Sequence, residues 1–252
     1  MSLPVHLVDA ADSGDSLIDA APGTSVTLEG DEAHHAVAVR RMRVGERLVL
    51  TDGAGTSVTA EVAATGKRLL TATVQDVRRV PEPAPAIVVV QALPKGDRGE
   101  LAVEMLTEVG VARVVPWAAS RSVAVWKGER ATKSLARWRA TAREAAKQAR
   151  RSWFPVVDEL ASTADVVALL AEAPLAVVLH EEASVPLASL DLPAEGPLVI
   201  VVGPEGGLTD EEVAAFVAAG AASVRLGAEV LRTSTAGVAA AAALLSRTPR
   251  WS

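Results

Sequence analysis

A proline-rich segment divides the sequence into two parts with different hydrophobic patterns. Residues 80–86 read VPEPAPA and carry three prolines in seven positions, a composition typical of a linker. Before this segment, short β-like runs alternate with turn residues. After it, strand-like runs alternate with helical ones. The sequence therefore predicts an all-β domain over residues 1–79, a linker over 80–86 and an α/β domain over 87–252.

The first part is predicted to fold as a small β-barrel or β-sandwich of short strands. Strand-like runs lie at residues 25–28, 47–50, 57–64 and 69–77. Asp52-Gly53 stands between the second and third runs, and such a pair is a strong hairpin signal. One short helix is expected at residues 31–39.

The second part is predicted to form a mostly parallel sheet with helices on both faces. The expected strands are residues 87–92, 112–117, 155–157, 176–180, 198–202 and 223–226. The expected helices are residues 99–109, 132–151, 163–171, 210–219 and 233–246. Two late strands end in glycine turns, at Gly203-Pro204-Glu205-Gly206-Gly207 and at Leu226-Gly227. Because parallel strands end at the same edge of a sheet, these turns predict a ligand crevice there.

The glycine turns do not match three common site motifs. The chain contains no G-x-x-x-x-G-K-[ST] phosphate loop and no G-x-S-x-G nucleophile elbow. Gln91-Ala92-Leu93-Pro94-Lys95-Gly96 follows the first α/β strand, where a dinucleotide fingerprint would require G-x-G-x-x-G. These mismatches exclude the usual nucleotide-binding and hydrolase folds.

Composition excludes several further classes of protein. The chain has no cysteine, which excludes disulfides and thiolate metal sites. No cluster of His, Asp and Glu has metal-ligand spacing, so no metal is expected. No apolar run reaches the roughly 18 residues of a membrane span, and the N-terminus lacks signal-peptide character. A cytoplasmic protein is expected.

The charge is unevenly distributed along the chain. The net charge is −6, yet residues 113–151 hold eleven Lys or Arg against two Glu. Residues 152–252 hold four basic and thirteen acidic residues. A second basic cluster, Arg40-Arg41-Met42-Arg43, lies in the first part. Local basic clusters, rather than net charge, indicate a phosphate-bearing partner, although a solvated amphipathic helix would also explain residues 131–151.

Several motifs together resemble one family. Gly203–Gly207, Leu226-Gly227 and Val230-Leu231-Arg232-Thr233 look like the cofactor-binding signature of the SPOUT class of S-adenosylmethionine-dependent methyltransferases. The closer match is to the RsmE family, which methylates N3 of a uridine, U1498, in 16S ribosomal RNA. Further segments agree with that family along nearly the whole chain, namely residues 34–44, 95–98, 106–111, 121–122 and 143–148.

The resemblance implies a fold, a cofactor and partners. The fold would be a PUA-like barrel followed by an α/β-knot domain, whose C-terminal part is threaded as a trefoil knot. The cofactor would be S-adenosylmethionine, bound near the interface of a homodimer, and the substrate would be 16S rRNA of the small ribosomal subunit. The cofactor-binding residues would be Leu179, His180, Val202, Gly203, Pro204, Glu205, Gly206, Gly207, Leu226, Gly227, Val230, Leu231 and Thr233.

The residues expected to contact RNA are basic. They are Arg40, Arg41, Arg43, Lys95, Arg121, Arg143, Lys147, Arg150 and Arg151. Trp126, Trp138 and Trp153 lie in or beside the basic segment, where they would either stack on bases or pack in the core.

Two residues are candidates for catalysis. Arg232 would stabilise the negative charge that develops on a uracil oxygen, or it would pair with Glu205 or cap a helix. Glu205 would accept the N3 proton, unless water does so or Glu205 caps the following helix. His180 would touch cofactor or substrate, or serve a structural role.

The chain departs from the family at one position. Ser234-Thr235-Ala236 stands where the family has Glu-Thr-Ala, so no role of that glutamate carries over. Two alternatives to uridine N3 methylation therefore remain. One is ribose 2′-O methylation of RNA by the same fold, and the other is RNA binding without catalysis.

Overall fold

The computed structural model describes residues 3–9, 16–193 and 195–251. The chain divides into two compact units, of which the first comprises residues 1–82 with 147–154 and the second 83–146 with 155–252. The sequence did not predict that residues 147–154 belong with the first unit. The expected domain limits themselves stay a prediction.

The first unit is a curled five-stranded sheet in the order β1-β3-β4-β5-β2. Its strands are β1 (Val5–Leu7), β2 (Ser25–Glu29), β3 (Arg47–Thr51), β4 (Thr56–Thr65) and β5 (Leu69–Arg79). All pairings are antiparallel except that of β1 with β3. Alternate residues of the strands, Leu48, Leu50, Val58 and Ala60 among them, point into one apolar core. The β-barrel predicted for this region is confirmed as a PUA-like domain.

Two local features of this unit differ from expectation. β1 had no strand signal that the sequence analysis recognised. The helix expected at residues 31–39 is an α-helical turn, α2 (Gly30–His34), followed by a π-helical one, η1 (His35–Val39). The expected hairpin forms between β3 and β4, where the Asp52 carboxylate accepts hydrogen bonds from the backbone of Ala54 and Thr56.

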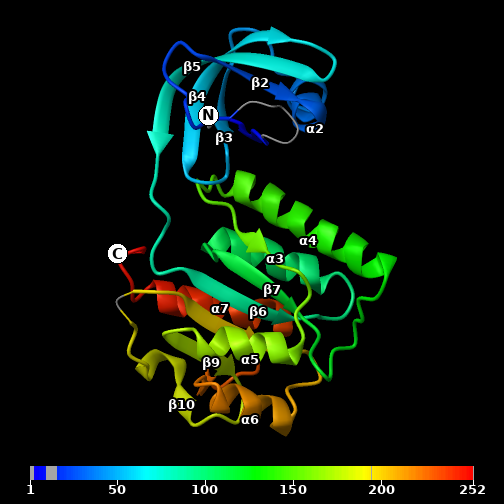
Figure 1. Ribbon diagram of the computed structural model, residues 1–252, viewed down its shortest axis with the longest axis vertical. Coiled ribbons are helices and arrows are strands. Elements are labelled where there is room, and N and C mark those ends of the chain that lie inside the picture. Colours follow the sequence, from blue (N-terminus) through cyan, green and yellow to red (C-terminus); the bar gives the residue numbers. More distant parts are fainter. Residues whose placement is uncertain (1–2, 10–15, 194, 252) are drawn as a thin grey trace. The chain divides into compact units, whose positions relative to one another are not determined.

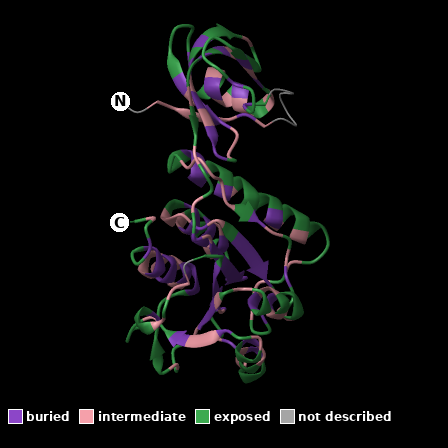
Figure 2. Cartoon of the chain, turned by 60° about the vertical axis from the view of Figure 1, so that its left-hand side comes forward, coloured by how far each residue is buried: buried purple, intermediate pink, exposed green. Residues whose placement is uncertain are grey.

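The second unit is a seven-stranded sheet in the order β10-β12-β9-β11-β6-β7-β8 (Figure 1). The strands are β6 (Ile87–Ala92), β7 (Arg113–Trp117), β8 (Val156–Val157), β9 (Leu175–Leu179), β10 (Val185–Pro186), β11 (Leu198–Val202) and β12 (Ala222–Arg225). Every recorded pairing in this sheet is parallel. β6 and β11 are buried along their whole length (Figure 2), as strands covered on both faces must be.

Helices cover both faces of this sheet. They are α3 (Arg98–Val109), α4 (Glu129–Gln148), α5 (Thr163–Ala171), α6 (Asp210–Ala218) and α7 (Thr233–Leu245), with a short 3₁₀ turn η2 (Leu187–Ser189). α3, α4 and α7 contribute to one apolar core and α5 and α6 to another on the opposite face. The predicted α/β class with a mostly parallel sheet is confirmed. The trefoil threading of the C-terminal part stays a prediction.

Candidate functional site

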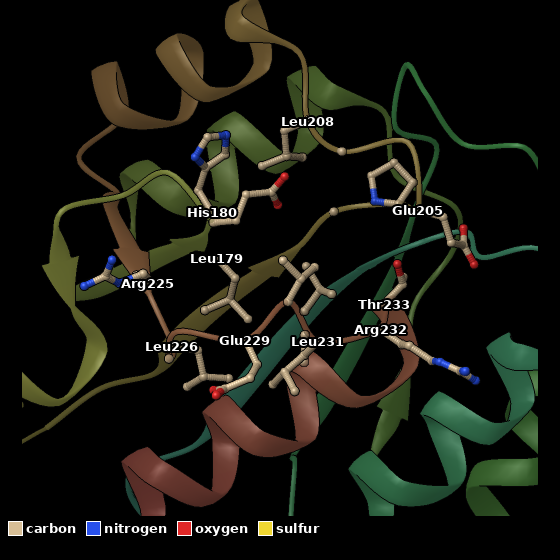
Figure 3. A pocket seen from close by; sticks show the side chains of 18 of the residues that line it. Leu179, His180, Glu205, Leu208, Arg225, Leu226, Glu229, Leu231, Arg232 and Thr233 are labelled. Atoms are coloured by element: carbon tan, nitrogen blue, oxygen red, sulfur yellow. The ribbon is translucent and has the colours of Figure 1, made fainter.

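A cavity of about 330 Å³ lies at the carboxyl ends of β9, β11 and β12 (Figure 3). Its walls come mainly from three chain segments, within residues 179–181 after β9, 202–208 after β11 and 225–233 after β12. These strands are parallel neighbours, so their ends share one edge of the sheet. The strand order reverses direction between β6 and β11, the kind of position where open α/β sheets bind ligands.

The turn after β11 is shaped by glycines. Gly207 has a φ of +73° and its N–H donates to the Pro204 carbonyl at 2.9 Å, a left-handed conformation that suits glycine. A Cβ on Gly203 would lie 3.1 Å from the Leu208 side chain. The backbone of this turn can therefore border the cavity without side chains in between.

The helix after this turn begins with a capping box. Thr209 and Glu212 exchange side-chain to backbone hydrogen bonds at the start of α6, and the buried Glu212 also accepts from the Ser120 N–H at 2.8 Å. The helix is therefore capped without Glu205, and that alternative role for Glu205 does not apply.

Arg121 holds the same turn from outside the cavity. Its guanidinium donates to the Leu208 carbonyl at 3.0 Å and to the Gly206 carbonyl at 3.3 Å. A Cβ on Gly206 would lie 3.1 Å from Cβ of Arg121. Gly206 does not line the cavity, in contrast to its neighbours. Gly206 lets Arg121 pack closely, and its expected cofactor contact stays a prediction.

The turn after β12 leads into α7. Leu226 and Gly227 border the cavity, and a Cβ on Gly227 would meet no atom closer than Glu229 Oε2 at 3.8 Å. Val230 is 77% exposed and Leu231 40% exposed, although both are apolar. The buried Gln91 amide donates to the Thr233 carbonyl at 3.4 Å and so ties the start of α7 to the end of β6.

Glu205 and Arg232 line the cavity without pairing with each other. Glu205 Oε1 accepts from the Lys95 N–H at 3.2 Å and lies 4.0 Å from Arg98 Nη1. Within residues 3–9, 16–193 and 195–251, no ion pair or hydrogen bond of the Arg232 guanidinium is found. Figure 3 shows its side chain directed away from the leucines of the cavity. An exposed cation, with no ion pair among the described residues, and a carboxylate therefore line the same cavity.

The lining contains residues that the sequence analysis did not single out. All expected cofactor-binding residues except Gly206 line the cavity, and His180 does so with its backbone N–H bonded to the Val224 carbonyl. The additional lining residues are Arg98, Glu181, Leu208, Arg225, Ala228, Glu229 and Ala236. Leu208 directly follows the glycine turn, and Arg98 closes the segment 95–98, so proximity to these motifs was the available signal.

Most residues expected to contact RNA are exposed. Arg40, Arg41, Arg43, Lys95, Arg143 and Arg150 have exposed side chains. Arg151 donates from Nε to the Trp153 carbonyl at 2.8 Å. Lys147 is only 9% exposed and its ammonium pairs with the Glu32 carboxylate within the first unit. An RNA contact by Lys147 stays a prediction.

The tryptophans of the basic segment pack inside the protein. Trp138 is buried and Trp126 meets it edge to face with ring centroids 5.1 Å apart. Trp153 donates its indole N–H to the Val80 carbonyl at 2.8 Å. Packing therefore accounts for all three side chains.

The sequence predicted neither a metal site nor a membrane span, and the described part of the chain was searched for both. In that part, no three His, Cys, Asp or Glu side chains come together as a metal site would require. No helix among the described residues is long and apolar enough to cross a membrane.

Comparisons with known proteins agree with this architecture. A family of RNA methyltransferase domains matches residues 81–245, and a family of RNA methyltransferase PUA domains matches residues 28–75. The chain is 45% identical over 240 residues to ribosomal RNA small subunit methyltransferase E of Mycobacterium tuberculosis, covering 93% of this chain and 92% of that protein. It is 31% identical over 239 residues to the Bacillus subtilis protein of the same name, covering 92% and 93%.

Solved structures are similar over the whole chain. The ribosomal RNA small subunit methyltransferase E of Neisseria gonorrhoeae, bound to S-adenosylmethionine, superposes with a TM-score of 0.84 at 27% identity, covering 98% of both chains. A Legionella pneumophila protein in complex with the same cofactor superposes with a TM-score of 0.87 at 26% identity, also covering 98% of both.

Proposed function

The chain belongs to the ribosomal RNA small subunit methyltransferase E family, and on that premise we propose that it transfers a methyl group from S-adenosylmethionine to N3 of a uridine in 16S rRNA. The target is the nucleotide that the family resemblance implies, U1498.

The cavity carries this proposal. Its volume, about 330 Å³, falls in the range of about 300–1,000 Å³ usual for pockets that hold small ligands and cofactors. Its walls combine leucines with backbone from Gly203, Gly207 and Gly227, where the chain presents no side chains. Bare backbone beside apolar walls suits an adenine and a ribose, because N–H and C=O groups can bond their polar edges. The residues present therefore fit S-adenosylmethionine.

The protein's part in the reaction is mainly alignment. S-adenosylmethionine, when bound, supplies an electrophilic methyl group for an in-line displacement. The turns after β11 and β12 would hold the cofactor, and the leucine side chains of residues 179, 226 and 231 would supply its apolar walls. Exposed Val230 and Leu231 at the rim become covered when the site is filled. Holding the reacting groups in one geometry lowers the entropic part of the barrier.

Arg232 is the proposed electrostatic catalyst. Uracil N3 is a poor nucleophile until its proton is lost, and its anion spreads charge onto O2 and O4. A guanidinium with no ion pair among the described residues is free to face such an oxygen and stabilise that charge. Glu205 is the proposed proton acceptor. Its Oε1 is engaged by Lys95 and Arg98, and no hydrogen bond in the described part of the chain uses Oε2.

The RNA must present the uridine unpaired. N3 lies on the Watson–Crick edge, so a duplex would hide it, and flipping it out costs a few kcal/mol. The exposed arginines at positions 40, 41, 43 and 143, with Lys95, are proposed to bind phosphates. We further propose that the protein acts in the cytoplasm as a homodimer on the small ribosomal subunit.

The proposal is tested with labelled cofactor. The purified protein is titrated with S-adenosylmethionine in a calorimeter and then incubated with methyl-labelled cofactor and either 16S rRNA or small subunits. We expect saturable binding and label in the RNA. Absence of binding heat at millimolar cofactor would instead support RNA binding without catalysis, the alternative that Ser234 keeps open.

A further inference from the structure

A second cavity, of about 310 Å³, lies entirely within the first unit. It is formed between the outer face of the sheet β1-β3-β4-β5 and the segment of residues 150–152. The inner face of the same strands carries Leu48, Leu50 and Val58 into the barrel core. Nothing in the proposed methyl transfer uses this outer cavity.

The floor of this cavity is built from two rows of cross-strand neighbours. The strand register places Val5, Val49, Thr59 and Asp76 side by side in one row. The next row holds Thr51, Ser57 and Arg78. The first row is therefore apolar at one end, at Val5 and Val49, and polar at the other, at Thr59 and Asp76.

The rim of the cavity is basic. Arg78, Arg150 and Arg151 line it. The guanidinium of Arg151 already forms one hydrogen bond, from its Nε to the Trp153 carbonyl. The guanidinium groups of Arg78 and Arg150 form none of the ion pairs or hydrogen bonds found among the described residues. The two cations suit the phosphate of a nucleotide, and the apolar floor beside them suits its base.

The backbone of Arg150 supports a role for its side chain. Arg150 has a φ of +53°, one of two positive φ values among the described non-glycine residues, and it follows the end of α4. Glycine is the usual residue at such a left-handed position after a helix. An arginine there costs backbone strain that the surrounding structure offsets, and strained residues of this kind cluster at functional sites.

The segment that carries Arg150 is fixed to the sheet. Gly55 N–H donates to the Ser152 carbonyl at 2.9 Å, and Phe154 N–H donates to the Gly53 carbonyl at 2.8 Å. A Cβ on Gly55 would lie 2.8 Å from the indole ring of Trp153, so the hairpin packs tightly against this segment. The cavity is therefore a preformed feature of the unit.

We propose that this cavity binds one unpaired nucleotide of the RNA substrate, away from the methylated uridine. The base lies on Val5 and Val49, with its N–H edge facing Thr59 and Asp76. The adjoining phosphate contacts Arg78 and Arg150. This inference rests on the proposed function for the identity of the RNA, but its residues lie wholly outside the cofactor pocket.

The experiment compares Arg78→Gln and Arg150→Gly with Lys67→Gln in the full-length protein. Lys67 is an exposed lysine of the same unit that does not line the cavity, and its variant removes the same charge. The probe is a single-stranded RNA of random sequence that carries 4-thiouridine and a fluorescent label. Anisotropy gives the RNA Kd over a range of salt concentrations, and calorimetry gives the S-adenosylmethionine Kd as a check on folding. Cross-linked peptides are identified by mass spectrometry.

The expected result is specific to the cavity. Arg78→Gln and Arg150→Gly each weaken RNA binding about three- to tenfold, the effect of one lost phosphate contact, and lower the salt slope by about 0.7. Lys67→Gln changes neither value. Arg150→Gly also keeps or raises the melting temperature, because glycine relieves the left-handed strain. Cross-links fall on peptides that contain Val5 or Val49–Thr59.

Two results would overturn the inference, and both differ from failure of the proposed function. Unchanged RNA binding in both arginine variants, or an equal loss in Lys67→Gln, shows that the cavity holds no nucleotide. If methyl transfer still occurs, the proposed function stands without this site. If the wild-type protein transfers no methyl group while the arginine variants still lose RNA affinity, the nucleotide site stands and the proposed function fails.

Discussion

The guanidinium of Arg121 donates to the carbonyl of Leu208 at 3.0 Å and thereby fixes the glycine turn that borders the cofactor cavity. A second bond from the same nitrogen reaches the Gly206 carbonyl at 3.3 Å. Leu208 lies 87 positions after Arg121 in the chain, and Gly206 lies 85 positions after it. Arg121 was expected to bind RNA, and the structure gives it a further task.

Removing this side chain should weaken cofactor binding. Arg121→Ala loses two hydrogen bonds from a charged donor at a partly exposed site, which we expect to cost about 1 kcal/mol, or roughly fivefold in the S-adenosylmethionine Kd. Calorimetry measures it, and Arg143→Ala, also an exposed arginine, serves as the control. If the variant binds the cofactor with an unchanged Kd and binds RNA more weakly, then Arg121 contacts RNA and does not support the cofactor site.

Gly227→Ala should weaken cofactor binding without lowering the stability of the fold. Its φ is not in the left-handed range and the nearest atom to a new Cβ is 3.8 Å away, so the chain can accept the methyl group. The methyl group would, however, enter the cavity wall. We expect a melting temperature close to wild type and a cofactor Kd raised at least about tenfold, a loss of about 1.4 kcal/mol. Equal cofactor binding by the variant would argue that this turn does not hold the ligand.

Arg232→Ala should reduce turnover rather than cofactor affinity. If Arg232 faces charge that appears only in the transition state, kcat falls about 10²–10³-fold, as when one oxyanion donor is removed. Arg232→Lys keeps the positive charge and should recover part of the rate. Steady-state kinetics with rRNA and calorimetry with cofactor are compared. Loss of cofactor binding in the alanine variant would reassign Arg232 to the cofactor pocket.

The buried pair of Glu32 and Lys147 should make the first unit sensitive to acid. Burial raises the pKa of Glu32, but hydrogen bonds and charge from His6 and Lys147 outweigh burial and lower the pKa from 4.5 to about 2. A depressed pKa stabilises the folded state above pH 4.5, and this stabilisation is lost as the pH falls towards 2.

Lys147→Gln should therefore raise the pH at which the protein unfolds in acid. The variant removes one of the two partners that lower the pKa of Glu32. Circular dichroism over an acid titration measures the midpoint. Lys133→Gln is the control, because Lys133 lies on the same helix with a 78% exposed side chain. Identical midpoints for wild type and Lys147→Gln would show that the pair does not stabilise the fold.

The sequence predicted those features whose signals are local. Six strands and five helices of the second part follow from runs of apolar residues and their periodicity. The lining of the cavity follows from glycine turns at the ends of parallel strands, since that geometry brings residues 203 and 227 to one edge. The leucines at 179, 226 and 231 were expected from the family resemblance, and all three line the cavity.

Features that depend on distant contacts were not predicted. In the sequence, Lys147 looks like any other exposed lysine of a basic helix. Only the fold shows that it pairs with Glu32, which lies 115 positions away in the chain. The expected helix 132–151 ends instead at Gln148, because the chain turns at left-handed Arg150 and joins the β3–β4 hairpin. Periodicity records which face of a helix is apolar, but it does not record which strand the following residues contact.

The proposed methyl transfer to uridine N3 is tested by nucleoside analysis of the product. Small subunits lacking the modification are incubated with the protein and S-adenosylmethionine, and the 16S rRNA is digested to nucleosides for mass spectrometry. Base and ribose methylation fragment differently, so the two products are distinguished. We expect N3-methyluridine to appear with the wild-type protein and to be strongly reduced with Arg232→Ala. Methyl label on ribose, or on another base, would contradict it.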